Sequence, residues 1–315
     1  MTRTALSKLA LLTCALLGSS IAEASADTRL GIVVETLGNP YFACLKAGAE
    51  AEAAKHPEVK LTVIGAATGT DLVGMTRMID DMLQKGVDVI SFNAIDPNAM
   101  IQTVKKAHEK GVKVLMHSDD TSEPVAEHYV GANQYEIENV VAGMLARQIG
   151  GKGKVAIIEG VPGNMTSVQR KKGAMDAFAK YPDIKVVGVW AGNWDRAQGL
   201  QKAQDILTAH PDLAGILAVN DEMALGALQA VRARNLAGKV AVTGANGVPE
   251  SLKAVYKGDL AATVVTYCAD IGEAIVTTAL ALGRGEGGPT TYNVDTRYDA
   301  IDTRVAKTVF DGISK

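Results

Sequence analysis

Short runs rich in β-branched residues alternate with longer amphipathic segments along almost the whole chain from Thr28 onward. The short runs have the length and composition of buried strands, whereas segments such as 40–56, 71–86 and 221–238 have the apolar spacing of helices. This alternation is typical of parallel sheets that are covered by helices on both faces. The predicted strands span residues 29–34, 60–66, 87–93, 112–117, 127–131, 154–160, 184–190, 214–220, 239–245 and 260–266.

The alternating pattern occurs twice. One series runs from Leu30 to about Gly131, and a second begins after residues 133–154 with the strand 154–160. Two similar halves predict an α/β protein with a cleft between its halves. The Gly-rich stretch 281–294 has no apolar periodicity, so we expect it to be a connector.

Several predicted strands end at a polar residue just before a helix, namely Asn93, Ser118, Asn220 and Asn246. In open α/β sheets, ligands bind outside the carboxyl ends of the strands, so these residues are candidates to line a crevice. Each of them could instead serve only as a helix cap, because Asn and Ser are favoured at that position. For any one residue both interpretations stay open, but the four together favour a shared crevice.

The overall composition excludes several functional classes. The net charge of −3 gives no basic surface for nucleic acid, and the His and Cys residues show no metal-ligand spacing. Motifs of nucleophilic hydrolases, zinc proteases and dinucleotide-binding loops are absent from the sequence. The stretch 150–154, GGKGK, is predicted to be a turn. We therefore expect no catalytic residues, no metal and no cofactor.

The first 26 residues have the pattern of a cleaved signal peptide. Arg3 and Lys8 precede an apolar stretch from Leu9 to Leu17, and Ala24 and Ala26 stand at the −3 and −1 positions of a cleavage site. Cleavage there would leave an exported, soluble protein that begins at Asp27. A lipoprotein site at Cys14 is the less favoured alternative, because Thr13 is a poor residue before such a site.

Two cysteines, Cys44 and Cys268, remain after the predicted cleavage. A disulfide is permitted outside the cytoplasm, but two cysteines this far apart in sequence carry no pairing signal. The favoured interpretation is that they are two separate buried thiols.

Some of the few aromatic residues, which make up 4% of the chain, stand at strand ends or beside turns. Tyr41 and Phe42 follow a Gly-Asn-Pro turn, Phe92 precedes Asn93, and Trp194 lies in a polar loop. Aromatic faces stack on the C–H surfaces of sugars and polyols, and Asn, Asp and Arg pair with their hydroxyls. Each aromatic residue taken alone fits a core position better.

Five segments, 31–53, 88–100, 166–178, 208–228 and 260–272, carry a recognisable resemblance, and NDEMALGAL within the fourth is among its more specific signatures. They resemble, in order, segments of the ribose-binding protein family, the type I periplasmic sugar-binding proteins of ABC importers. The resemblance covers nearly all of the predicted mature chain. It implies two doubly wound parallel-sheet α/β domains, joined by a three-segment hinge, that close on a sugar.

The resemblance also implies a set of ligand-binding residues at the strand ends and loops of both domains. They are Glu35, Asn39, Tyr41, Phe42, Asn93, Ser118, Asp119, Arg170, Trp194, Asn220, Asn246 and Thr266. The Gly-Asn-Pro turn would then place Tyr41 and Phe42 against the ligand.

The sequence departs from the ribose-binding pattern at several of these positions. The positions of Ser118 and Asn246 resemble sites for Asp, and those of Asp119, Glu35 and Thr266 resemble sites for Arg, Ser and Gln. A buried carboxylate needs hydroxyl or cationic donors. We therefore expect a ligand other than ribose, with Glu35 and Asp119 as candidates to pair with its hydroxyls.

The resemblance implies a monomeric periplasmic protein that captures a monosaccharide or sugar alcohol and delivers it to a membrane ABC permease. The implied domains are 27–132 with 267–294, and 133–266 with 295–315, and the hinge lies near Gly131, Thr266 and Asp295. Delivery to a chemoreceptor or sensor kinase is the alternative. A repressor needs a helix-turn-helix before the first strand, where only the predicted signal peptide stands. A secreted α/β enzyme is the remaining rival.

Overall fold

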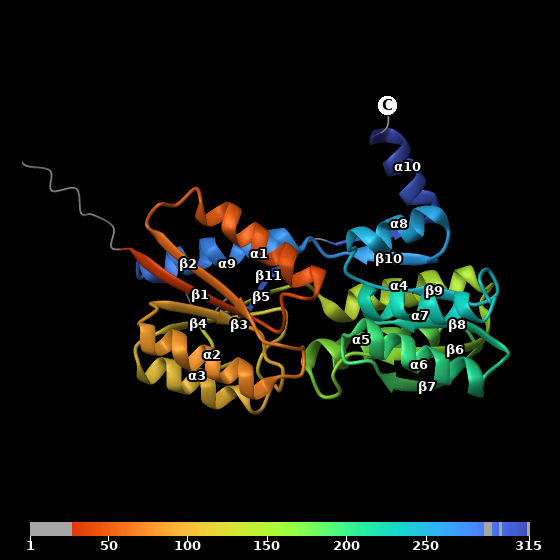
Figure 1. Ribbon diagram of the computed structural model, residues 1–315, viewed down its shortest axis with the longest axis horizontal. Helices are drawn as coiled ribbons and strands as arrows, with labels where there is room; N and C mark the ends of the chain where they lie inside the picture. Colours follow the sequence, from red (N-terminus) through yellow and green to blue (C-terminus); the bar gives the residue numbers. More distant parts are fainter. Residues whose placement is uncertain (1–26, 287–291, 296–297, 314–315) are drawn as a thin grey trace, which may run out of the picture.

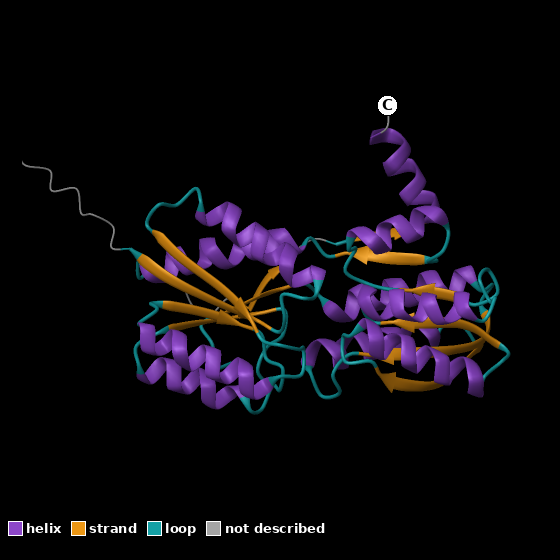
Figure 2. Cartoon of the chain, in the orientation of Figure 1, coloured by secondary structure: helices purple, strands orange, loops and turns teal. Residues whose placement is uncertain are grey.

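The computed structural model describes residues 27–286, 292–295 and 298–313, and these form two lobes, each built on a six-stranded sheet (Figure 2). The strand order is β11-β5-β4-β3-β1-β2 in the N-terminal lobe and β12-β10-β9-β8-β6-β7 in the C-terminal lobe. All pairs are parallel except β10 with β12. The strands are β1 (Thr28–Val34), β2 (Val59–Gly65), β3 (Val89–Phe92), β4 (Lys113–His117), β5 (His128–Gly131), β6 (Lys152–Glu159), β7 (Asp183–Ala191), β8 (Leu213–Ala218), β9 (Ala241–Thr243), β10 (Ala262–Val265), β11 (Tyr292–Asp295) and β12 (Asp299–Asp302).

Helices connect most of the strands, and several of them begin at a side chain that caps the first turn. Asn39, Asp71, Asn133, Asn164 and Asn220 each accept a hydrogen bond from a backbone N–H in the first turn of the helix that follows. The helices are α1 (Pro40–Ala53), α2 (Leu72–Lys85), α3 (Met100–Glu109), α4 (Gln134–Gln148), α5 (Met165–Phe178), α6 (Arg196–Ala209), α7 (Asp221–Ala233), α8 (Pro249–Lys257), α9 (Cys268–Gly283) and α10 (Thr303–Ile313).

The N-terminal lobe has helices on both faces of its sheet. In Figure 1, α1 and α9 lie on one face and α2 and α3 on the other. Each face has its own apolar core: Leu45 and Ile275 belong to one, and Met75, Ile79 and Met100 belong to the other. The helix α9 follows β10 along the chain, so this lobe is completed by a segment that comes after most of the C-terminal lobe.

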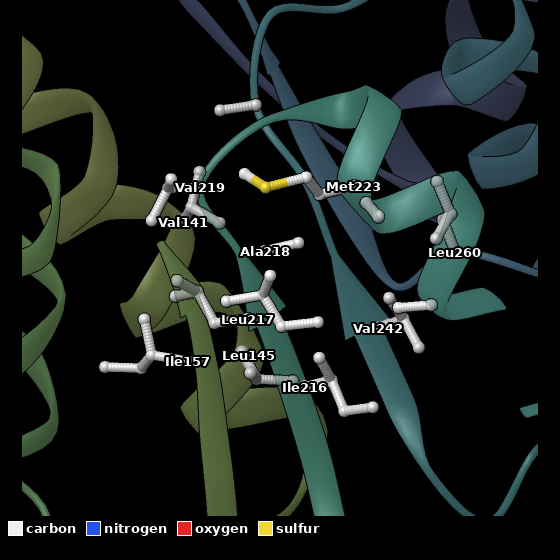
Figure 3. Packing of buried hydrophobic residues seen from close by; sticks show 14 of the residues in the cluster. Val141, Leu145, Ile157, Ile216, Leu217, Ala218, Val219, Met223, Val242 and Leu260 are labelled. Carbon is white, nitrogen blue, oxygen red and sulfur yellow. The ribbon is translucent and has the colours of Figure 1, made fainter. Parts of the chain in front are cut away.

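The C-terminal lobe has one continuous apolar core. Figure 3 shows part of it, where Val141 and Leu145 of α4 lie near Ile157 of β6 and Leu217 of β8. The central strands are buried on both sides because the helix pairs α4–α5 and α6–α7 pack over the sheet. A rigid sheet of this kind fixes the positions of the loops at its carboxyl edge.

The chain passes between the two lobes at three places. These are residues 132–133 after β5, residues 266–267 after β10, and the segment between β11 and β12. Tyr267 has a φ of 43°, a left-handed conformation that is uncommon for a residue with a side chain. Because so few residues connect the lobes, rotation between them requires changes at only a few backbone positions.

The two sheets confirm the predicted fold class of two parallel-sheet α/β lobes. The prediction that residues 281–294 form a connector is wrong at both ends of this range. Its first residues, through Gly283, complete α9, and its last ones, from Tyr292, form β11. The strand β11 pairs with β5, which lies more than a hundred residues earlier, so local periodicity gives no sign of it. The strand β12 was not predicted either, and it pairs antiparallel with β10.

The prediction of two separate thiols is also wrong, because Cys44 and Cys268 form a disulfide between α1 and α9. The two helices approach closely at Gly48 and Gly272, where an added Cβ would lie 2.2 Å from the carbonyl oxygen of Ala269 and 2.1 Å from that of Leu45. Helix backbones this close bring the Cα atoms of the two cysteines to 5.7 Å. The pairing thus results from non-local helix packing.

The predicted signal peptide, residues 1–26, lies outside the described residues. Within the part of the chain that the structure describes, no helix is both long enough and apolar enough to cross a membrane.

Candidate functional site

A cavity lies where the carboxyl edges of the two sheets face each other. All the predicted site residues except Asn93 and Thr266 line it, and two residues that were not predicted, Gln134 and Thr166, complete it. The lining residues are Glu35, Asn39, Tyr41, Phe42, Ser118, Asp119, Gln134, Thr166, Arg170, Trp194, Asn220 and Asn246.

The aromatic part of the wall comes from the start of α1. Asn39 caps this helix by accepting from the backbone N–H of Tyr41 at 3.0 Å, and Pro40 occupies the first helical position. Tyr41 and Phe42 are then held edge to face, with ring centroids 5.1 Å apart and planes at 77°. Both rings are buried, at 7% and 4% exposure, so the turn presents an ordered apolar surface to the cavity.

Glu35 follows β1 and is held by Asn93, which follows β3. The Asn93 amide donates to Oε1 of Glu35 at 2.8 Å, and Oε2 has no hydrogen bond among the described residues. Burial raises the pKa of the Glu35 carboxyl well above its usual range, the charge of Asp119 adds to this effect, and the Asn93 hydrogen bond opposes it. Asn93 does not line the cavity, so its observed part in this arrangement is to position Glu35.

Ser118 adopts a φ of 58°, which turns the chain sharply at the end of β4. Its hydroxyl lies 3.1 Å from that of Tyr41, and its carbonyl oxygen accepts from the hydroxyl of Tyr129 at 2.9 Å. The strained turn is therefore held on both sides by tyrosine hydroxyls.

Asp119 joins the two lobes. Its Oδ1 accepts from the backbone N–H of Thr166 at 2.9 Å, and the Thr166 hydroxyl donates to the carbonyl oxygen of Ser118 at 2.9 Å. A third bond runs from Asn164 to the carbonyl oxygen of Ala94 at 3.1 Å. Burial raises the pKa of the Asp119 carboxyl, against the opposing hydrogen bonds from Thr166 and Asn164. These contacts describe a closed arrangement of the lobes around the cavity.

Arg170 in α5 is the cation of the cavity wall. Its guanidinium donates through Nε to Oε1 of Gln134 at 2.9 Å, through Nη2 to Oδ1 of Asn246 at 3.0 Å, and through Nη1 to the carbonyl oxygen of Val219. Arg170 is 4% exposed. Three acceptors hold the planar group in one orientation, and two of its five N–H groups take no part in these bonds.

Trp194 lies in the loop between β7 and α6 with a φ of 63°. Its indole ring covers Gly160, where a Cβ would lie 2.1 to 2.4 Å from three ring carbons. Asn220 holds the loop by donating to the carbonyl oxygen of Trp194 at 3.2 Å. Only a glycine at position 160 leaves room for the ring in this position.

Thr266 does not line the cavity but lies next to Asn246, which does. It is 1% exposed, and its backbone N–H donates to the carbonyl oxygen of Asn246 at 3.3 Å. The residues that sequence reasoning missed, Gln134 and Thr166, each stand at the start of a helix after an Asn cap. That position is the signal by which they could have been found, since the first turns of α4 and α5 point toward the cleft.

The chain is similar in sequence and fold to known proteins. The sequence model of a protein family, the periplasmic binding protein domain, matches residues 30–287 of this chain. The chain belongs to the periplasmic binding protein family. The D-allose-binding periplasmic protein of Escherichia coli is 32% identical over 257 residues, which cover 79% of this chain and 82% of that protein. The xylitol-binding protein of Mycolicibacterium smegmatis is 28% identical over 253 residues, 78% of this chain and 70% of that protein.

A solved member of the family is similar in structure as well. It is an ABC transporter periplasmic solute-binding protein from Actinobacillus succinogenes with bound D-allose, 34% identical, with a TM-score of 0.82 over 89% of this chain and 99% of that one. This two-lobed fold is thus shared with a solved member of the family. Among the described residues, no group of three or more His, Cys, Asp or Glu side chains could hold a metal ion.

Proposed function

We propose that this chain binds a monosaccharide or sugar alcohol in the cavity between its lobes and does not alter it chemically. The observation that carries the proposal is one cavity with an ordered aromatic pair, Tyr41 and Phe42, and polar groups from both lobes held by internal hydrogen bonds. An aromatic face against C–H surfaces, with fixed polar groups around it, is the combination that a hydroxylated small molecule requires.

Binding is coupled to closure of the lobes. The N-terminal lobe contributes Glu35, Asn39 and the aromatic pair, and the C-terminal lobe contributes Arg170 and Asn246. A ligand meets both sets only when the lobes are closed, so it stabilises the closed form by its differential affinity. The three connections between the lobes, near residues 132–133, 266–267 and 295, act as the hinge, and they divide the chain into lobes 27–132 with 267–294 and 133–266 with 295–315.

The relatives support the ligand class. Proteins named for allose and xylitol are similar to this chain over more than three quarters of its length. Ribose itself is disfavoured, because Ser118 and Asn246 stand at positions that resemble Asp in the ribose-binding pattern. The family also supports a periplasmic location after cleavage of the first 26 residues, with delivery of the bound solute by the monomer to a membrane ABC permease.

A thermal-shift screen of the protein beginning at Asp27 tests the proposal. The panel contains pentoses, hexoses, pentitols, tetritols, inositols and amino sugars. A compound that binds only the folded protein adds about 2.7 kcal/mol of stability at a hundredfold excess over its Kd. We expect a clear rise in Tm with one sugar or polyol, reduced in Glu35→Gln and unchanged in Glu136→Gln, an exposed position on α4. No shift across the panel would contradict the proposal.

A further inference from the structure

The amide side chains around the cavity have their oxygens engaged by groups that can only donate. Oε1 of Gln134 and Oδ1 of Asn246 accept from the guanidinium of Arg170, and Oδ1 of Asn220 accepts from the backbone N–H of Met223 at 2.9 Å. Arginine and a backbone N–H have no acceptor, so these contacts determine which end of each amide is oxygen. The group that each amide has left without a first hydrogen bond is therefore on its N–H side, while its oxygen is already engaged once.

The C-terminal wall of the cavity, which we define as Gln134, Arg170, Trp194, Asn220 and Asn246, therefore offers donors. Several N–H donors of this wall have no acceptor among the described residues. They are two N–H groups of Arg170 and the NH₂ groups of Gln134 and Asn246. The indole Nε1 of Trp194 is likewise a buried donor without a partner in that part of the chain. A carboxylate at position 246 would supply an acceptor, but this chain has the amide.

The acceptors are on the opposite side. Both carboxylates of the cavity, Glu35 and Asp119, come from the N-terminal lobe. Oδ1 of Asp119 already accepts from Thr166, whereas Oε2 of Glu35 has no hydrogen bond among the described residues. The hydroxyls of Tyr41 and Ser118, also in this lobe, can accept as well as donate. The cavity is thus polarised, with both carboxylates on the N-terminal side and the unpaired N–H donors on the C-terminal wall. The hydroxyl of Thr166, also from the C-terminal lobe, donates to the carbonyl oxygen of Ser118 and is the one lining hydroxyl of that lobe among the described residues.

This polarity bears on the choice, left open by the proposed function on which it rests, between a sugar and a sugar alcohol. Every hydroxyl that accepts from the C-terminal wall also carries a hydrogen. Among the described residues, each amide oxygen of that wall already accepts from an N–H group, so this hydrogen can reach only a second lone pair on an oxygen that is already engaged. A buried donor without a partner is costly. A ring-ether, carbonyl or carboxylate oxygen has no such hydrogen.

We propose that the C-terminal wall binds an acceptor-only oxygen while Glu35 accepts from a hydroxyl at the opposite end, so that the solute is a sugar or sugar acid and not the corresponding alditol. Asn246 is the residue that determines this preference. An Asp at this position keeps one oxygen for Arg170 and turns the remaining N–H donor into an acceptor.

The test is isothermal titration calorimetry with three matched sets of probes: D-allose, allitol and D-allonate; D-xylose, xylitol and D-xylonate; D-ribose, ribitol and D-ribonate. Within the set that binds, we expect the aldose or the aldonate to bind about tenfold or more tightly than the alditol, the factor that one unpaired buried donor produces. In Asn246→Asp this ratio should fall by about tenfold and binding of the aldonate should be lost. Asn235→Asp, an exposed position in the same lobe, should keep the parent ratio.

Three results would overturn the inference. The alditol could bind as tightly as its aldose and aldonate, Asn246→Asp could leave the ratio unchanged, or none of the nine compounds could bind. The first two leave the proposed function intact, because a carbohydrate still binds. For the third, the thermal-shift panel decides whether the proposed function fails as well.

Discussion

The carboxylate of Asp119 in the N-terminal lobe accepts a hydrogen bond from the backbone N–H of Thr166, in the first turn of α5 in the C-terminal lobe, at 2.9 Å. The first N–H groups of a helix have no partner within the helix and attract negative charge. The two lobes therefore attract each other through groups of the protein itself. A ligand adds to this attraction when it binds.

Removal of this bond should favour the open form. In Asp119→Ala we expect the fraction of closed protein without ligand to fall by about tenfold, because a hydrogen bond to a charged group contributes roughly 1.5 to 3 kcal/mol. Small-angle X-ray scattering should then give a larger radius of gyration than for the parent. Asp96→Ala is the control, since Asp96 bonds only to backbone N–H groups of its own loop. Equal radii for Asp119→Ala and the parent would refute a role in closure.

Glu138, fully buried in α4, should make the protein less stable as the pH rises. Burial raises its pKa from 4.5 to about 8, opposed by the charge of Arg170 and reinforced by that of Asp221. Between these two pH values the folded protein keeps the proton and the unfolded chain loses it. The free energy of unfolding therefore falls, by at most about 1.4 kcal/mol per pH unit from this group, and it levels off above pH 8.

The measurement is the Tm of Glu138→Gln and of the parent between pH 5 and 9. The variant stays neutral at every pH, so its Tm should exceed that of the parent by a margin that grows up to pH 8. Glu136→Gln, exposed on the same helix, should follow the parent. A constant difference between Glu138→Gln and the parent would show that Glu138 does not titrate in this range.

The disulfide should stabilise the fold because it closes a long loop. Cys44 and Cys268 are 224 residues apart, and chain-entropy arguments give an upper limit of roughly 5 kcal/mol for a loop of this length. We expect the double variant Cys44→Ala, Cys268→Ala to unfold at lower urea concentration than the parent. A reducing agent should lower the midpoint of the parent and leave that of the variant unchanged. Free thiols in the unreduced parent would contradict the pairing.

Gly160 should be required for ligand binding because it leaves room for the indole ring of Trp194, although Gly160 itself does not line the cavity. A methyl group at Gly160 cannot coexist with the observed indole position, so Gly160→Ala must displace the ring. We expect binding of the panel sugar to weaken about tenfold or more, with a change in tryptophan fluorescence and an unchanged far-UV circular dichroism spectrum. Gly143→Ala, in the middle of α4, serves as the matched control. Unaltered affinity in Gly160→Ala would show that the position of Trp194 is not critical.

The strands and helices that local patterning predicts agree closely with the structure. The strand predicted at 29–34 spans Thr28–Val34, and the Gly-Asn-Pro turn does start α1 at Pro40. Both follow from nearby residues: a β-branched run forms a buried strand, and an Asn side chain caps the helix after it. The disulfide and β11 could not be predicted in this way, because each depends on a segment more than a hundred residues away.

The same division applies to the site. The sequence by itself determined which side chains stand at the ends of strands, among them Ser118, Asn220 and Asn246, and its resemblance to a known family supplied the other predicted residues that line the cavity. Only the tertiary structure decided what each of them can offer a ligand. Asn246 presents its N–H groups because Arg170, from α5, donates to its oxygen, and Asp119 bridges the lobes because α5 begins opposite it. Hydrogen-bonding capacity depends on partners that folding brings together, so the sequence order of these residues cannot reveal it.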